Sequence, residues 1–95
     1  MLIKYGVRGR IHSKLVCKFG DIHKIWDGEE PVITSIGEGT HLPNSKHYYN
    51  PSQAIDLRLP KGFLKMKVEK LQASLGAQYY FVLLHTTHIH LQWNG

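Results

Sequence analysis

Two histidines, His88 and His90, stand two residues apart in a segment of alternating apolar and polar side chains. Residues 87–93 place Ile89 and Leu91 on the opposite side from the histidines, which predicts a β-strand with one buried and one open face. In a strand, side chains two residues apart point the same way, with about 6.5–7 Å between their Cα atoms. Both imidazoles are therefore expected above one patch of sheet, where they could bind a metal ion.

An aspartate and a third histidine can complete such a site. Residues 54–59 also alternate, which predicts a strand with Asp56 on its polar face. His47 precedes Asp56 across a segment rich in proline and asparagine, which can fold back over the sheet. Two imidazoles and one carboxylate are typical of catalytic zinc sites, because three protein ligands leave a fourth tetrahedral position open. A single cysteine, Cys17, argues against a structural zinc site.

Each of these patterns has a simpler explanation when taken alone. A His-x-His pair on a strand is more often a polar outer face than a metal site. An isolated aspartate in a strand indicates even less. The combination carries more weight, because it coincides with a resemblance that extends beyond the spacing.

Residues 45–58, SKHYYNPSQAIDLR, resemble the Ser-x-His-Tyr…Ala-x-Asp-x-Arg segment of a zinc-peptidase superfamily. The superfamily includes D-alanyl-D-alanine carboxypeptidases and dipeptidases, phage endolysins and penicillin-insensitive murein endopeptidases. The Hedgehog signalling domain shares the same metal site. The resemblance implies that His47, Asp56 and His90 bind Zn²⁺, His90 being the second histidine of the later His-x-His.

The chain departs from the common family pattern in two places. The interval between His47 and Asp56 is two residues longer than in that pattern. Many members also carry a glutamate shortly before the last ligand, where this chain has histidines. His85-x-x-His88-x-His90 instead fits the murein endopeptidase branch, although the same departure also fits an enzyme that has lost activity.

The resemblance implies a hydrolytic mechanism in which zinc activates water near neutral pH. We expect His88 to be the catalytic proton acceptor and donor, a role that suits an imidazole. His85 is the second expected catalytic residue, which orients His88 or stabilises the reacting centre. Four further residues are expected to support the site or bind substrate: His41, Ser45, Tyr48 and Arg58.

The elements that must position these residues can be read from hydrophobic periodicity. Residues 12–26 and 63–75 show helical spacing, with Cys17 expected in the core and the Lys65-Lys67-Lys70 stripe expected in solvent. Segments 31–36 and 79–84 add two strands to the two described above. The predicted fold is a single α+β domain over residues 1–95, with two helices on one face of a small antiparallel sheet, as in Hedgehog and the D,D-peptidases.

Composition limits the functional classes. Twelve Lys and Arg against seven Asp and Glu give a net charge of +5, which favours an anionic partner. The expected partner is a peptide of bacterial peptidoglycan. No run approaches the ~18 apolar residues of a membrane span, and no secretory signal opens the chain. We therefore expect no membrane partner and synthesis in a cytosol. The resemblance to phage endolysins, and no residue of this chain, makes a phage-encoded enzyme an attractive source.

Two rival functions remain open from the sequence. A non-catalytic zinc module would keep the ligands and lack turnover, as an interaction domain of the Hedgehog kind does. A small basic nucleic-acid-binding protein would use the net charge of +5 and the lysine stripe. We favour the peptidase over nucleic-acid binding, because that stripe reads equally well as the solvated side of a helix. Oligomeric state is not predicted.

Overall fold

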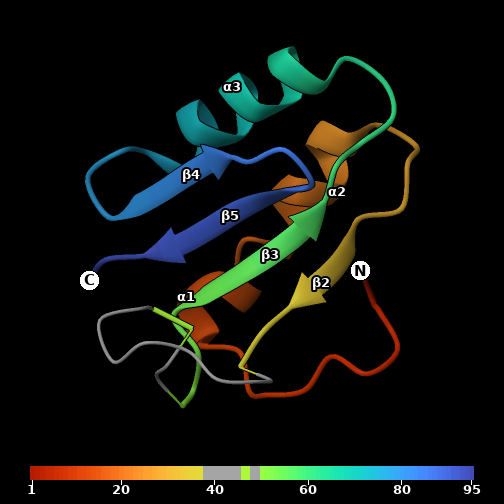
Figure 1. The fold of residues 1–95 in the computed structure, drawn as a ribbon. Coiled ribbons are helices and arrows are strands. Elements are labelled where there is room, and N and C mark those ends of the chain that lie inside the picture. Colours follow the sequence, from red (N-terminus) through yellow and green to blue (C-terminus); the bar gives the residue numbers. More distant parts are fainter. Residues whose placement is uncertain (38–45, 48–49) are drawn as a thin grey trace.

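The computed structural model describes residues 1–37, 46–47 and 50–95 (Figure 1). The elements follow in chain order: β1 (Leu2–Ile3), α1 (Ser13–Val16), α2 (Phe19–Trp26), β2 (Val32–Ser35), β3 (Ala54–Arg58), α3 (Leu64–Leu75), β4 (Tyr80–Leu84) and β5 (His88–Trp93). The four strands and the second long helix predicted from periodicity are therefore present, with ends that differ by one or two residues.

The strands form a five-stranded sheet in the order β1-β2-β3-β5-β4. Strands β2, β3, β5 and β4 pair antiparallel, as predicted, whereas β1 pairs parallel to β2. The predicted α+β class is confirmed, but the sheet is mixed and not purely antiparallel. Strand β1 was missed because its two residues, both exposed, carry no alternating pattern.

The first predicted helix, over residues 12–26, is broken in two. The Lys18 N–H donates to the carbonyl of Leu15, three residues back, and this tighter turn ends α1 before α2 begins. Cys17 lies at the break and is exposed, so the prediction that it belongs to the core was wrong. None of the helices in the described part of the chain is long and apolar enough to cross a membrane.

The helices lie together on one face of the sheet, and the core fills the space between (Figure 1). Ile55 and Leu57 of β3 and Ile89 and Leu91 of β5 are fully buried there. They meet helix residues that include Leu15, Ile22, Trp26, Leu71 and Leu75. Alternation along β3 and β5 turns the intervening polar residues toward the opposite face, which no helix in the described part of the chain covers.

One lysine of the predicted solvated stripe is buried. Lys67 is 5% exposed, and its Nζ donates a hydrogen bond to the carboxylate of Glu29. The same carboxylate accepts the backbone N–H groups of Lys61 and Gly62, at the turn that leads into α3. The prediction that Lys67 is exposed to solvent was wrong, because the charge pattern of a helix does not show that a residue outside it, here Glu29, binds one of its lysines.

Candidate metal centre

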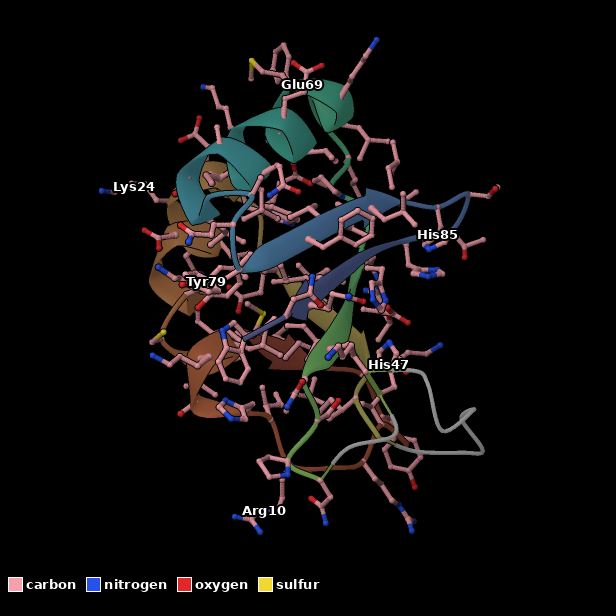
Figure 2. The ribbon with its side chains drawn as sticks, turned by 90° about the vertical axis from the view of Figure 1, so that its left-hand side faces the viewer. Arg10, Lys24, His47, Glu69, Tyr79 and His85 are labelled. Carbon is pink, nitrogen blue, oxygen red and sulfur yellow. The ribbon has the colours of Figure 1, made fainter. Side chains whose placement is uncertain are left out.

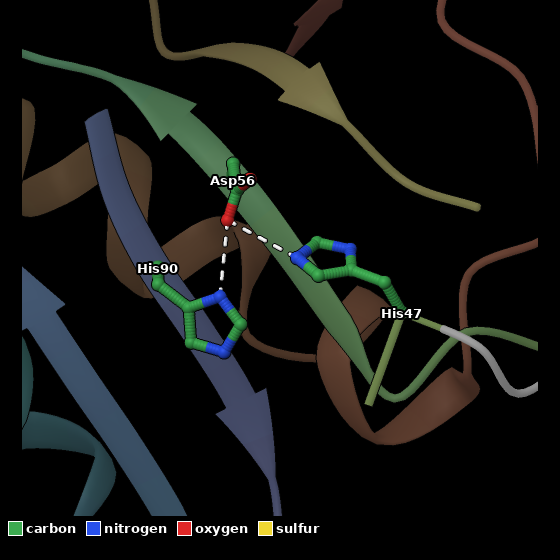
Figure 3. Close-up of side chains that lie close together, drawn as sticks. All are labelled: His47, Asp56 and His90. Atoms are coloured by element: carbon green, nitrogen blue, oxygen red, sulfur yellow. Dashed lines mark hydrogen bonds and ion pairs between the residues drawn. The ribbon is translucent and has the colours of Figure 1, made fainter. Parts of the chain in front are cut away.

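Asp56 and His90 lie directly opposite each other on β3 and β5. The backbone N–H of Trp93 donates to Gln53, so by alternation the backbone groups of His90 point toward β4. Asp56 and His90 therefore form a non-hydrogen-bonded pair, the type in which the Cα atoms approach to about 4.5 Å. Oδ1 of Asp56 lies 3.1 Å from Nδ1 of His90 (Figure 3).

A β-bulge in β2 borders Asp56. Ile33 pairs with Leu57, but the next pair joins Ser35 to Asp56, so β2 contains one extra residue there. Such bulges bend a strand and re-aim its neighbours. Strand β2 then leads to Ile36, whose carbonyl oxygen forms part of the site.

His47 approaches the same carboxylate from the loop between β2 and β3. Its side chain is 6% exposed, and its Nε2 lies 3.2 Å from Oδ1 of Asp56. Its Nδ1 donates a hydrogen bond to the carbonyl oxygen of Ile36 at 2.6 Å. The backbone thus fixes the ring so that Nε2 points at the carboxylate (Figure 3).

His90 is held in the same manner by a side chain. Its Nε2 lies 2.7 Å from Oε1 of Gln92, two residues further along β5. The amide nitrogen of Gln92 donates in turn to Oδ1 of Asn94 at 2.6 Å, which turns the amide oxygen toward His90. Nδ1 of His90 is therefore the nitrogen that faces Asp56.

The two rings share an unusual hydrogen-bond requirement. Each has one nitrogen against an amide oxygen and the other against Oδ1 of Asp56, and all of these oxygens are acceptors. A neutral imidazole has one N–H and can satisfy only one of its two oxygens. The contact with the carboxylate therefore needs either a second ring proton, which makes the ring an imidazolium, or a cation between the ring nitrogen and Oδ1.

The donor set fits a small divalent metal ion. The three ligand atoms that His47, Asp56 and His90 offer all lie within 4.8 Å of one another. A tetrahedral ion with ligand bonds of about 2.0–2.1 Å places its ligand atoms roughly 3.3 Å apart, close to the 3.1 and 3.2 Å found here. In addition, each histidine directs its second ring nitrogen to an oxygen, as metal-binding histidines almost always do. This group could hold a metal ion.

The electrostatics of Asp56 follow from its neighbours. Partial burial acts to raise the pKa of its carboxyl, but hydrogen bonds from His47 and His90 outweigh that effect. The proximity of His47 and His88 adds to the lowering, and the pKa of Asp56 lies well below its usual range. Asp56 is therefore an ionised carboxylate near neutral pH, and a carboxyl group must be ionised to bind a metal ion.

The two predicted catalytic histidines lie beside this group. Nε2 of His88 is 3.8 Å from Oδ2 of Asp56, the oxygen that faces neither His47 nor His90 in the contacts above. Nδ1 of His88 lies 3.0 Å from the hydroxyl of Thr87. His85 stacks on His88 with 4.6 Å between ring centroids, on the uncovered face of the sheet (Figure 2).

The remaining predicted site residues divide into two sets. Arg58 lies opposite His88 on the neighbouring strand and is exposed, at the border of the group. Three others lie outside the described residues: His41, Ser45 and Tyr48.

Two members of the site were missed from the sequence. Gln92 carried a signal, because it follows His90 by two residues on the polar face of the same predicted strand. The Ile36 carbonyl carried none, since any residue supplies a backbone oxygen and only the folded loop selects which one.

Comparison with models of protein families, with curated protein sequences and with solved structures found no match to this chain.

Proposed function

We propose that this protein is a zinc-dependent peptidase that cleaves peptide bonds in bacterial peptidoglycan. One observation carries the proposal: two imidazole nitrogens converge on Oδ1 of Asp56 while their partner nitrogens already donate to other oxygens. A bound divalent ion would supply both contacts at once. It would take the place of the second proton on each ring, so the group would keep the total charge that it has with two imidazolium rings.

The donor types favour zinc among the common metal ions. Imidazole nitrogen with one carboxylate oxygen suits zinc, whereas magnesium and calcium prefer sites built from oxygen alone. Structural zinc sites close with four protein ligands and are typically rich in cysteine, and Cys17 is the only cysteine of the chain. Three protein ligands are typical of catalytic sites, which keep one position for water or substrate.

When bound in such a site, zinc polarises a carbonyl group and makes water reactive near neutral pH. His88 is placed to handle the proton of that reaction. In the tautomer whose Nδ1–H donates to Thr87 Oγ1, the lone pair is on Nε2, which lies 3.8 Å from Oδ2 of Asp56. In our proposal Nε2 accepts a proton from water and delivers it to the nitrogen of the leaving amine.

His85 acts through His88. The stacked ring restricts rotation of the His88 ring. We assign His85 as a positioning residue, which keeps Nε2 of His88 turned toward the metal centre.

The substrate class rests on the resemblance of residues 45–58 to zinc peptidases of the bacterial cell wall and on charge. A net charge of +5 favours the approach of a small protein to an anionic wall polymer. The finer fold assignment, to the architecture shared by Hedgehog and the D,D-peptidases, is part of the same proposal. The α+β sheet, with its helices on one face and His47 and His85 on the other side, supports it (Figure 2).

The test combines metal analysis with digestion. Purified protein is loaded with zinc, or stripped with a chelator, and each form is incubated with purified muropeptides whose products are separated by mass. We expect cleavage by the zinc-loaded form, and its loss in the stripped form and in His88→Ala, which should still bind one zinc per chain. Zinc binding without any cleavage would favour the non-catalytic module. Binding to nucleic acid that weakens with added salt and does not depend on zinc would favour the basic nucleic-acid-binding protein.

A further inference from the structure

Two large apolar side chains lie exposed on the metal-bearing face of the sheet. Phe81 and Leu83 of β4 are 42% and 40% exposed, although the alternate residues Tyr80 and Val82 are buried toward the helices. The apolar strip that Phe81 and Leu83 form needs an explanation, because exposed apolar residues on an edge strand invite aggregation.

The apolar strip adjoins the metal centre. Leu83 lies opposite the ligand His90, and Phe81 lies opposite Gln92, which orients that ligand. Strand alternation directs all four side chains to the same face of the sheet. A ligand bound at the metal centre can therefore extend over β4 and reach Phe81 and Leu83.

The edge of β4 is closed where the strip lies. Oε1 of Gln72 accepts the backbone N–H of Val82, and its Nε2 donates to the carbonyl of Tyr80. A peptide can therefore not add as a sixth strand there without displacing this amide. The apolar strip is open to a ligand that lies on the face of the sheet, not along its edge.

The size of the strip limits the occupant. Two side chains exposed by about two fifths offer roughly 150–200 Å² of apolar surface, whereas a stable protein interface needs about 800 Å² from each partner. The strip matches a single aliphatic side chain, spanning two positions about 6.5–7 Å apart.

We propose that Phe81 and Leu83 form a specificity subsite that receives an aliphatic side chain of the substrate beside the scissile bond. This inference rests on the proposed peptidase function. The subsite selects substrates that place an aliphatic group over β4, from the alanine methyl of a wall peptide to a leucine-sized probe. It disfavours glycine or a carboxylate at that position, because a charge there loses hydration against apolar surface.

The experiment uses synthetic stem pentapeptides in which each position in turn carries Gly, Ala, Leu or Glu. For the zinc-loaded wild type, we expect one position to favour Leu over Gly by at least about tenfold in kcat/KM, because even a single methylene in an apolar pocket can give that much. In Phe81→Thr and Leu83→Thr the ratio should fall below about threefold, with zinc content and thermal midpoint retained. Threonine keeps the strand propensity at both positions.

Leu84→Thr is the matched control. Leu84 is 41% exposed and adjacent to Leu83, but alternation turns it to the other face of the sheet. It should leave the Leu-to-Gly ratio unchanged. The subsite proposal would be overturned if the Leu-to-Gly ratio of kcat/KM stayed at its wild-type value in Phe81→Thr and Leu83→Thr. It would also be overturned if that ratio fell as much in Leu84→Thr as in these two variants.

Failure of the proposed function is a separate outcome. If the zinc-loaded wild type cleaves no pentapeptide, binding of the Leu and Gly pentapeptides is compared by amide chemical-shift changes. Shifts at residues 80–84 with the Leu peptide alone support the subsite without catalysis. Equal shifts, or none, with both peptides reject it.

Discussion

Asp56 and His90 face each other across β3 and β5, and the 3.1 Å contact between Oδ1 and Nδ1 joins residues 34 positions apart. The same carboxylate oxygen receives Nε2 of His47 at 3.2 Å, so one atom organises the whole group. Because this convergence depends on the pairing of two strands, ligand variants should affect metal binding more than they affect the fold.

Removal of a ligand should abolish tight zinc binding. We expect His90→Ala and Asp56→Asn to weaken zinc affinity by at least about 100-fold, which exceeds the cost of losing a supporting hydrogen bond. His88→Ala should change affinity little, because His88 is not among the proposed ligands. Metal content by mass spectrometry and competition with a chromogenic chelator measure the difference. Equal loss in all three variants would contradict the assignment.

Gln92 should affect zinc affinity although it is not one of the proposed ligands. Replacing Gln92 with Leu removes the oxygen that receives Nε2 of His90, and we expect zinc affinity to fall about 10–100-fold. Gln78→Leu is a matched control, since Gln78 is exposed and distant in sequence from every ligand. A Gln92→Leu variant with wild-type affinity would show that the orientation of His90 does not depend on this contact.

Zinc should stabilise the folded chain. An ion held at 100 times its Kd adds about 2.7 kcal/mol, which raises the thermal midpoint of a domain of this size by roughly 10–20 °C. Chelator should reverse the shift, and Asp56→Asn should show almost none of it. The midpoint is followed by circular dichroism. An equal shift in Asp56→Asn would mean that zinc binds elsewhere.

The Glu29–Lys67 pair should make stability depend on acid pH. The hydrogen bond from Lys67, aided by the N–H groups of Lys61 and Gly62, lowers the pKa of Glu29 from 4.5 to about 2. A carboxyl with a lowered folded pKa stabilises fully above its unfolded pKa, and that stabilisation disappears as pH falls through the folded value. The contribution should therefore be lost between pH 4.5 and about 2.

Glu29→Gln tests this dependence. The variant should be less stable than wild type at neutral pH, because it leaves the buried Lys67 without its carboxylate, and the two should converge toward about pH 2. Thermal midpoints across this range measure the gap, with exposed Glu69→Gln as the control. A gap that stays constant with pH would rule out the ionised pair as its cause.

The local pattern of the sequence determined four of the five strands, the second long helix and the faces on which candidate ligands lie. A strand repeats every two residues, so His88 and His90 had to share a side, and Asp56 had to oppose Ile55 and Leu57. The resemblance of residues 45–58 added the choice of His47. These inferences needed no long-range information.

Only the tertiary structure decided which residues meet. The register that sets Asp56 against His90 depends on packing between distant segments, since a shift of one residue reverses every side chain of a strand. The pairing of Lys67 with Glu29 and the hydrogen bond from His47 to the Ile36 carbonyl arise in the same way. Periodicity shows which face of its element a residue lies on. The residue that it contacts there comes from a distant segment, and the local sequence pattern carries no information about that segment.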